Sequence, residues 1–358
     1  MPQAALAHAQ LVQSDPAPAA RLQSLPSAVT LFFTEPVTPA GPGIRVYAPS
    51  GKQVAGPLNA RGAVLSAPLS SSETGTFVVT WQVFAADTHP SRGAFEFSVG
   101  EPGANPYAAV LTSGEIGTST PLGLVLQALA HWVHFAGLAL MFGLAAYALL
   151  TRHGSFSRWI GVGVVLLVAA EPLAVLAQLA SLSFDGDTAV AVLGSPFGRL
   201  AGLRLGAALL AWTVLATNRS WPLVVIGGGV AVLDGFGAHA IREVPVVGQL
   251  LVSVHVAAMA LWVGGLAGYV RAPDSRFIRY AAVTFGVAAG TGAVLAFIHT
   301  DYLAGLLASA YGRAVLVKVA VVAAVAITVL ARRRRIELYG AFAIIGVAAV
   351  IAALPPPK

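Results

Sequence analysis

The sequence predicts an N-terminal all-β sandwich of the Ig-like, Greek-key type, followed by an all-α membrane bundle of eight helices in a 4+4 parallel repeat. Of 358 residues, 57% are hydrophobic and 10% are charged, whereas a soluble domain carries about 25% charged residues. Polar residues concentrate before residue 100, and nearly everything after Pro121 is apolar. A Gly/Pro/Ser/Thr-rich stretch separates the two parts. We therefore expect a β-domain at 8–99, a linker at 100–120 and a membrane domain at 121–358.

The composition restricts the chemistry. The chain has no cysteine, which excludes disulfides and thiolate ligands and leaves His, Asp, Glu and Met as metal ligands. The net charge is +6, but residues 8–99 hold five basic and five acidic side chains. The surplus therefore lies in the membrane part, and we expect no nucleic-acid partner. No nucleophile elbow, phosphate loop or metalloprotease helix is present in the sequence, so no hydrolase or phosphoryl-transfer activity is predicted.

The first seven residues end in Ala5-Leu6-Ala7, which is the small-x-small pattern of a signal-peptide cleavage site. We interpret 1–7 as the tail of a signal peptide, so that the mature chain begins at His8. The alternative is a disordered N-terminus. The β-domain that follows alternates between apolar runs and Gly/Pro/Ser turns, which predicts strands at 29–34, 44–48, 63–66, 76–84 and 94–99.

Three residues of the β-domain form a candidate metal site. Asp87 and His89 are separated by one residue, so in an extended chain their side chains point to the same side. If His8 is the first residue, its free amine and its ring nitrogen can chelate one ion. Together with the His89 imidazole and the Asp87 oxygen they make a tetragonal N,O set, which favours Cu(II).

The apolar part contains eight segments of about the 20 residues that a spanning helix requires. They are 123–150, 158–183, 199–217, 221–240, 248–270, 277–299, 312–331 and 336–354.

The connections between these segments alternate in charge. One set is rich in arginine (Arg152 and Arg158; Arg219; Arg271, Arg276 and Arg279; Arg332 to Arg335), and the other holds Asp185 and Asp187, Arg242 with Glu243, and Asp301. Because cytoplasmic loops carry the Lys/Arg excess, the first set is predicted to be inside. Both termini and the whole β-domain are then outside the cell membrane, which we expect to be a bacterial-type inner membrane crossed several times.

The eight segments repeat internally. Residues 134–143 align with 255–264 at an offset of 121, and the Gly-Arg pairs at Arg199 and Arg313 align at an offset of 114, each followed five residues later by a second cation, Arg204 or Lys318. Since four helices are an even number, the two halves share one orientation and are related by an axis along the membrane normal.

Ionisable residues inside the apolar segments predict a second site. Counted at about 1.5 Å per residue from Arg152 and Arg271, His134 and His255 lie about 24–27 Å from the cytoplasmic end. Intramembrane ionisable groups usually mark a functional site, and imidazole and thioether groups suit copper. The candidate membrane site comprises His131, His134, Glu171, Asp234, His239, His255, Met259 and His299.

Each of these assignments has a structural alternative. The rim histidines His131, His239 and His299 can be interfacial residues, and Met259 can simply fill the core. Arg204 and Lys318 can snorkel outward to the membrane surface.

Two sets of motifs carry a family resemblance. The N-terminal residues His8-Ala-Gln-Leu-Val-Gln-Ser-Asp-Pro-Ala, and Trp81 with Asp87-Thr-His89-Pro, Gly93, Phe95, Phe97 and Val99, resemble the periplasmic copper-binding protein CopC. The helical part resembles its membrane partner CopD through Gly237-Ala-His239, His255 with Leu261-Trp-Val-Gly-Gly265, and Tyr311-Gly-Arg313 with Lys318.

The resemblance covers nearly the whole chain as a CopC–CopD fusion. It implies Cu(II) bound through His8, Asp87 and His89, and copper movement across the inner membrane, generally as uptake. Some CopC proteins also carry a methionine-rich Cu(I) site, but this domain has no methionine after Met1, so we expect it to bind Cu(II) alone.

The leading hypothesis is a copper-acquisition protein, not an enzyme, that captures Cu(II) on the β-domain and passes copper, as Cu(I) or Cu(II), to a His/Glu site in the bundle. Its expected partners are the copper ion, the lipid bilayer and a periplasmic copper donor. One alternative is a membrane redox protein whose transmembrane histidines hold haem or reduce copper. Another is a copper sensor or buffer that does not transport. The sequence leaves transport direction, energy source and oligomeric state open.

Overall fold

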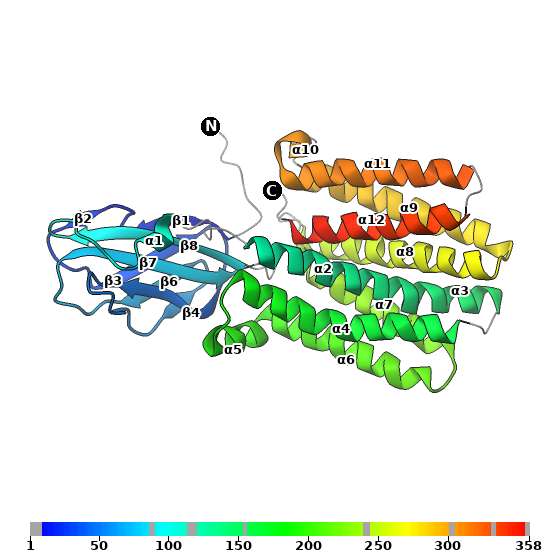
Figure 1. Ribbon diagram of the computed structural model, residues 1–358, viewed down its shortest axis with the longest axis horizontal. Coiled ribbons are helices and arrows are strands. Elements are labelled where there is room, and N and C mark those ends of the chain that lie inside the picture. Colours follow the sequence, from blue (N-terminus) through cyan, green and yellow to red (C-terminus); the bar gives the residue numbers. More distant parts are fainter. Residues whose placement is uncertain are drawn as a thin grey trace. The chain divides into compact units, whose positions relative to one another are not determined.

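A computed structural model describes residues 9–85, 90–112, 120–152, 156–238, 244–300, 305–330 and 334–354. The chain divides into two compact units, each described here by itself. The first contains the β-domain together with residues up to Leu124 and residues 177–198, and the second contains 125–176 and the chain from Arg199 onward. The all-β N-terminal part and the helical C-terminal part are confirmed (Figure 1).

The described strands of the first unit form two four-stranded sheets, ordered β1-β3-β6-β5 and β2-β8-β7-β4. All strand pairs are antiparallel except β2 with β8. The strands are β1 (Leu11–Asp15), β2 (Arg21–Leu22), β3 (Ala28–Phe33), β4 (Thr38–Tyr47), β5 (Asn59–Arg61), β6 (Val64–Pro68), β7 (Gly75–Phe84) and β8 (Pro90–Val99). The five predicted strands correspond to β3, β4, β6, β7 and β8.

The core of this unit draws on both sheets, because each strand turns alternate side chains inward. Leu31 and Leu65 come from one sheet, and Trp81 and Phe97 from the other. Trp81 limits which residue can stand at position 93, because Gly93 is its partner across β7 and β8. A Cβ on Gly93 would lie 2.6 Å from the Trp81 ring, so the indole occupies the space that any side chain there would need.

Two segments outside the strands belong to this unit. The start of the predicted linker is fixed by Asn105, which is buried and donates hydrogen bonds to the carbonyls of Tyr47, Ala48 and Thr76. Residues 177–198, which the sequence assigns to the membrane domain, include helix α5 (Gly186–Gly194), which packs against β4. There, Gly41 has a positive φ of 58°, and a Cβ at Gly41 would lie 3.0 Å from the Thr188 hydroxyl.

Each of the eight predicted apolar segments contains a helix. The helices are α2 (Pro121–Leu138) continuing through η1 (Ala139–Gly143) into α3 (Leu144–Thr151), then α4 (Ser157–Ser181), α6 (Pro196–Leu215), α7 (Ser220–Phe236), α8 (Pro245–Arg271), α9 (Arg276–His299), α11 (Ala310–Leu330) and α12 (Arg334–Ala353). The short helices α1 (Ala109–Thr112) and α10 (Gly305–Ala308) complete the set among the described residues.

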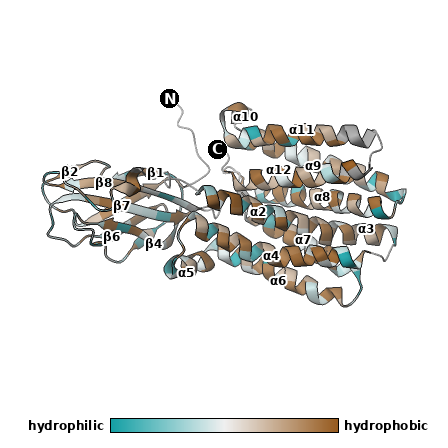
Figure 2. Ribbon diagram, viewed as in Figure 1, coloured by the Kyte–Doolittle hydropathy of each residue, from teal (hydrophilic) through white to brown (hydrophobic). Residues whose placement is uncertain are grey.

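Five of the described helices are long and apolar enough to cross a membrane, namely 121–151, 157–181, 196–215, 246–271 and 276–299. Two shorter apolar helices are 220–236 and 338–353. Figure 2, coloured by residue hydropathy, shows that hydrophobic residues (brown) predominate along these helices. The count of eight spans stays a prediction.

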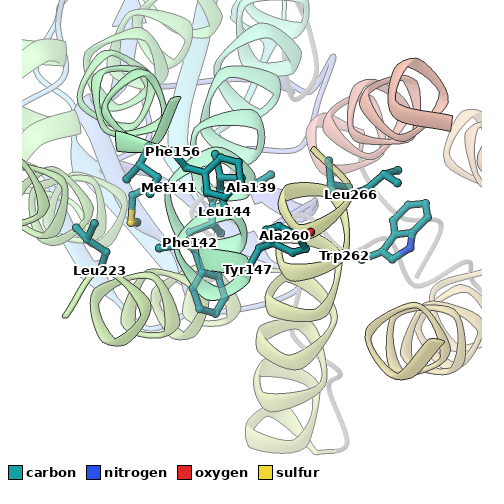
Figure 3. Packing of buried hydrophobic residues seen from close by; sticks show 14 of the residues in the cluster. Ala139, Met141, Phe142, Leu144, Tyr147, Phe156, Leu223, Ala260, Trp262 and Leu266 are labelled. Carbon is teal, nitrogen blue, oxygen red and sulfur yellow. The ribbon is translucent and has the colours of Figure 1, made fainter. Parts of the chain in front are cut away.

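Helix α8 lies at the centre of the bundle, where it contacts η1, α3, α7, α9 and α12. Figure 3 shows residues of the apolar cluster that η1, α3 and α8 share. The ring of Tyr147 lies against Gly268 of α8, and Phe142 lies against Gly227 of α7.

The crossing of η1 with α8 is reciprocal. A Cβ on Gly143 would overlap the carbonyl oxygen of Ala260, and a Cβ on Gly264 would overlap that of Ala139. Ala139 aligns with Ala260, and Gly143 with Gly264, at the offset of the sequence repeat. A twofold axis passing between the two helices would produce this exchange of contacts. Small residues are what permit helix backbones to approach this closely.

Candidate metal centre

The three predicted ligands of the β-domain, His8, Asp87 and His89, lie outside the described residues. The chain on either side of Asp87 and His89 is described, and it shows where they are attached. Strand β7 ends at Phe84 and β8 begins at Pro90, and these two residues pair with each other. The connection between the two strands of this hairpin therefore carries both predicted ligands.

The N-terminal segment is held beside that hairpin. Ala9 is fully buried, and its carbonyl accepts a 2.8 Å hydrogen bond from the Ser91 hydroxyl. The next residue is fixed as well, because Gln10 N donates to Thr34 Oγ1 at 3.0 Å and Gln10 O accepts from Thr34 N at 2.9 Å. The residue that follows His8 thus contacts the second residue after His89.

The bundle brings together three of the predicted membrane-site residues. His134 on α2 is buried, with its Nδ1 at 3.2 Å from Glu171 Oε1 on α4 and its Nε2 at 3.1 Å from Asp234 Oδ2 on α7. The other oxygen of Asp234 lies 2.9 Å from Arg204 Nε on α6. Helices α2, α4, α6 and α7 therefore meet in one network of charged and hydrogen-bonded side chains, which is buried except at the half-buried Arg204.

The geometry fixes the number of protons in this network. A neutral imidazole carries one N–H, yet both ring nitrogens of His134 face a carboxylate oxygen. A proton must therefore occupy the second contact, either on the imidazole or on one of the carboxyl groups. The network therefore holds one proton more than a neutral imidazole supplies.

Within the described part of the chain, no group of three or more His, Asp or Glu side chains has the geometry to hold a metal ion. The reason is visible at His134, because its two nitrogens lie on opposite edges of the ring and face different carboxylates. One ion cannot contact the imidazole, Glu171 and Asp234 together unless the ring turns. In this conformation the residues form a hydrogen-bonded ion network.

His255 on α8 makes a different set of contacts. Its Nδ1 lies 3.0 Å from Thr291 Oγ1 on α9, and its Nε2 lies 3.3 Å from Lys318 Nζ on α11. These contacts run to α9 and α11 and not to α2 or α4. That both repeats contribute to one site stays a prediction.

The remaining candidate residues are dispersed. His131 is half-buried and stacks on Phe135, with ring centroids 6.0 Å apart. His299 is buried, and its ring makes an angle of 64° with that of Tyr311. Met259 packs against the apolar core of the bundle, as the core-filling alternative expects. His239 lies outside the described residues.

Sequence reasoning missed three participants: Arg204, Thr291 and Lys318. The two cations were open to interpretation as snorkelling side chains, but both contact the candidate residues. Counted along the sequence, both cations lie at a depth similar to that of the histidines, and this similarity could have identified them. Thr291 gave none, because a threonine that bonds to its own helix is common in apolar segments.

The comparisons with known proteins concern first the β-domain. The CopC domain family matches residues 11–100. Protein YobA of Escherichia coli strain K12 is 33% identical over 98 residues, which cover 26% of this chain and 79% of YobA. The chain belongs to the CopC family. Copper resistance protein C of Xanthomonas campestris pv. juglandis is 31% identical over 105 residues, covering 26% of this chain and 82% of that protein.

The similarity to another relative extends beyond the CopC domain. Copper transport protein CutJ of Bacillus subtilis strain 168 is 25% identical over 366 aligned positions, which cover 89% of this chain and 66% of CutJ. The helical part accordingly fits a CopD-like membrane domain. Among solved structures, CopC from Methylosinus trichosporium OB3b is 26% identical, with a TM-score of 0.25, and covers 27% of this chain and 98% of that structure.

Proposed function

We propose that this protein binds Cu(II) at its CopC domain and passes copper to the bundle for import across the inner membrane. One observation carries the proposal: a CopC domain and a buried His–carboxylate network occur in the same chain. CutJ, whose name states copper transport, aligns with most of the chain. In the proposed function the copper ion is the transported substrate.

At the CopC domain we propose His8, Asp87 and His89 as the ligands. The hydrogen bond from Ser91 to Ala9 supports this set, because it joins the two chain segments that carry the ligands. Chain connectivity then limits how far His8 can be from His89. An amine, two imidazoles and a carboxylate suit Cu(II).

In the bundle we propose that copper exchanges with the proton held at His134, with Glu171 and Asp234 as further ligands after the ring turns. A buried cation needs compensating charge, and here two carboxylates face one guanidinium. Metal ligands must be deprotonated to bind. Replacing the proton by copper keeps anionic groups paired in both states.

The topology follows from the positive-inside rule. We expect reporter fusions placed after the inner connections to report cytoplasm and a fusion at the C-terminus to report the outside. The fusion points are Arg158, Arg219, Arg276, Arg335 and Lys358. A cytoplasmic signal at Lys358 would contradict the proposed orientation.

The transport step is tested by copper accumulation in cells. Cells that express the protein should accumulate more copper than cells without it, and His134→Ala should return accumulation to the level of cells without the protein, because the bundle site then lacks its imidazole. Thr213→Ala, on an exposed stretch of α6, is the matched control and should accumulate as wild type.

The same experiment separates the alternatives. Unchanged accumulation, with copper still bound to the purified protein, would identify a sensor or buffer. An intense Soret band in the purified protein would identify a haem-binding redox protein instead.

A further inference from the structure

The direction of each hydrogen bond at His255 can be assigned. Thr291 has one hydroxyl proton, and its Oγ1 lies 2.7 Å from the carbonyl oxygen of Val287 in the preceding turn. With that proton engaged, Thr291 Oγ1 accepts from His255 Nδ1–H. A neutral imidazole with its proton on Nδ1 has a bare Nε2, which accepts from the Lys318 ammonium. The Nε2 lone pair, the one available to a metal, is occupied.

The charges of the two polar sets are opposite. Around His134 there are two carboxyl groups and one guanidinium, so apart from the proton that they share with the imidazole the surroundings carry a net negative charge. Around His255 the polar contacts among the described residues are a hydroxyl and an ammonium, so this set of contacts carries a net positive charge. A cation is attracted to the first set and repelled by the second.

The two sets occupy equivalent places in the repeat. His134 aligns with His255, and Arg204 aligns with Lys318, at the offsets of the two repeated motifs. Glu171 and Thr291 each contact Nδ1 of the aligned histidine, from the helix that follows it. The second repeat thus keeps the histidine and the cation, but has a threonine where the first has a glutamate.

The lysine also takes a different partner from its counterpart. Arg204 binds a carboxylate, whereas Lys318 binds the imidazole directly. The ring of His255 lies close to the backbone of Gly292, where an added Cβ would come within 2.8 Å of its Cε1. The imidazole and the ammonium are therefore positioned as a pair.

We propose that Lys318 is a tethered cation that occupies, in the second repeat, the position that copper takes in the first. Only His134, of the two aligned histidines, then accepts metal. This inference rests on the proposed function in one respect, namely that copper binds at His134. The contact between Lys318 and His255 can be tested without that assumption.

The first test is nitrogen-15 resonance of the imidazoles in the full-length labelled protein, with His255 assigned from its loss in His255→Gln. We expect a neutral ring with its proton on Nδ1 and a hydrogen-bonded Nε2. Lys318→Met should shift the Nε2 resonance, and Lys318→Arg should preserve it. A proton on Nε2 in the wild type would overturn the proposal, even if the Lys318 variants do not fold.

The second test measures the copper bound to the purified full chain after incubation with a copper salt alone. The chain carries Asp87→Ala and His89→Ala, so that the CopC site does not bind copper. In that background, His134→Gln should lose the remaining copper and His255→Gln should retain all of it. Loss of copper in His255→Gln would overturn the proposal. A background that holds no copper would instead refute the bundle site of the proposed function, while the resonance test still decides the role of Lys318.

Discussion

The CopC domain that begins at His8 should bind Cu(II) at least about 100-fold more tightly than the same domain preceded by residues 1–7, because even outer-shell partners of a metal contribute 10- to 100-fold in affinity. A peptide bond before His8 blocks its α-amine, and only the imidazole remains. The chelate ring that amine and imidazole form together is then lost. Since the ligands must be deprotonated, affinity in both forms should fall at low pH.

The measurement is a competition titration of the two N-terminal forms, with paramagnetic resonance to count nitrogen ligands. We expect one more nitrogen ligand in the form that begins at His8. His89→Ala and Asp87→Ala should each weaken binding in that form. Equal affinity and equal nitrogen count in both forms would show that the N-terminus takes no part in the site.

Gly264→Val should abolish the folded bundle. A side chain at this position meets the backbone carbonyl of Ala139, and a backbone atom cannot move to another rotamer as a side chain can. Overpacking that neighbouring side chains can relieve costs about 1–3 kcal/mol, so a clash against backbone should exceed that range. This is a large part of a typical folding free energy of about 5–15 kcal/mol.

The readout is thermal unfolding and size-exclusion behaviour of the detergent-purified protein. Gly286→Val is the matched control, because Gly286 also lies in an apolar helix but has no heavy atom within 4 Å of an added Cβ. It should unfold near the wild-type temperature. Equal stability of the two variants would mean that the helices do not cross as closely as described.

Sequence periodicity was sufficient to predict the elements that bury one face or are apolar throughout. Strands β3, β6 and β7 alternate or run apolar, and the long helices exceed the length that a membrane requires. The elements that were missed lack this signal. Of the three missed strands, β1 fully buries only Ser14, β2 has two residues and β5 is exposed along its whole length, so none carries an apolar pattern of burial.

The candidate membrane site was predictable in depth but not in direction. Counting residues from the arginine-rich ends placed His134, His255 and Asp234 at similar heights in the apolar segments. Which way each side chain faces around its helix depends on packing between helices, and no single segment contains that information. The pairing of His134 with Asp234, and of His255 with Lys318, therefore required the structure.

The π-helical turn η1 gives the two aligned helices a different winding. Residues 134–143 align with 255–264 without a gap, yet 139–143 form a π-turn whereas the aligned residues 260–264 lie within the α-helix α8. A π-turn holds one residue more than an α-turn, so the same number of residues turns the chain through a smaller angle about the helix axis. The part of the first helix that follows Gly143 therefore faces a different direction relative to His134 than the matching part of α8 faces relative to His255.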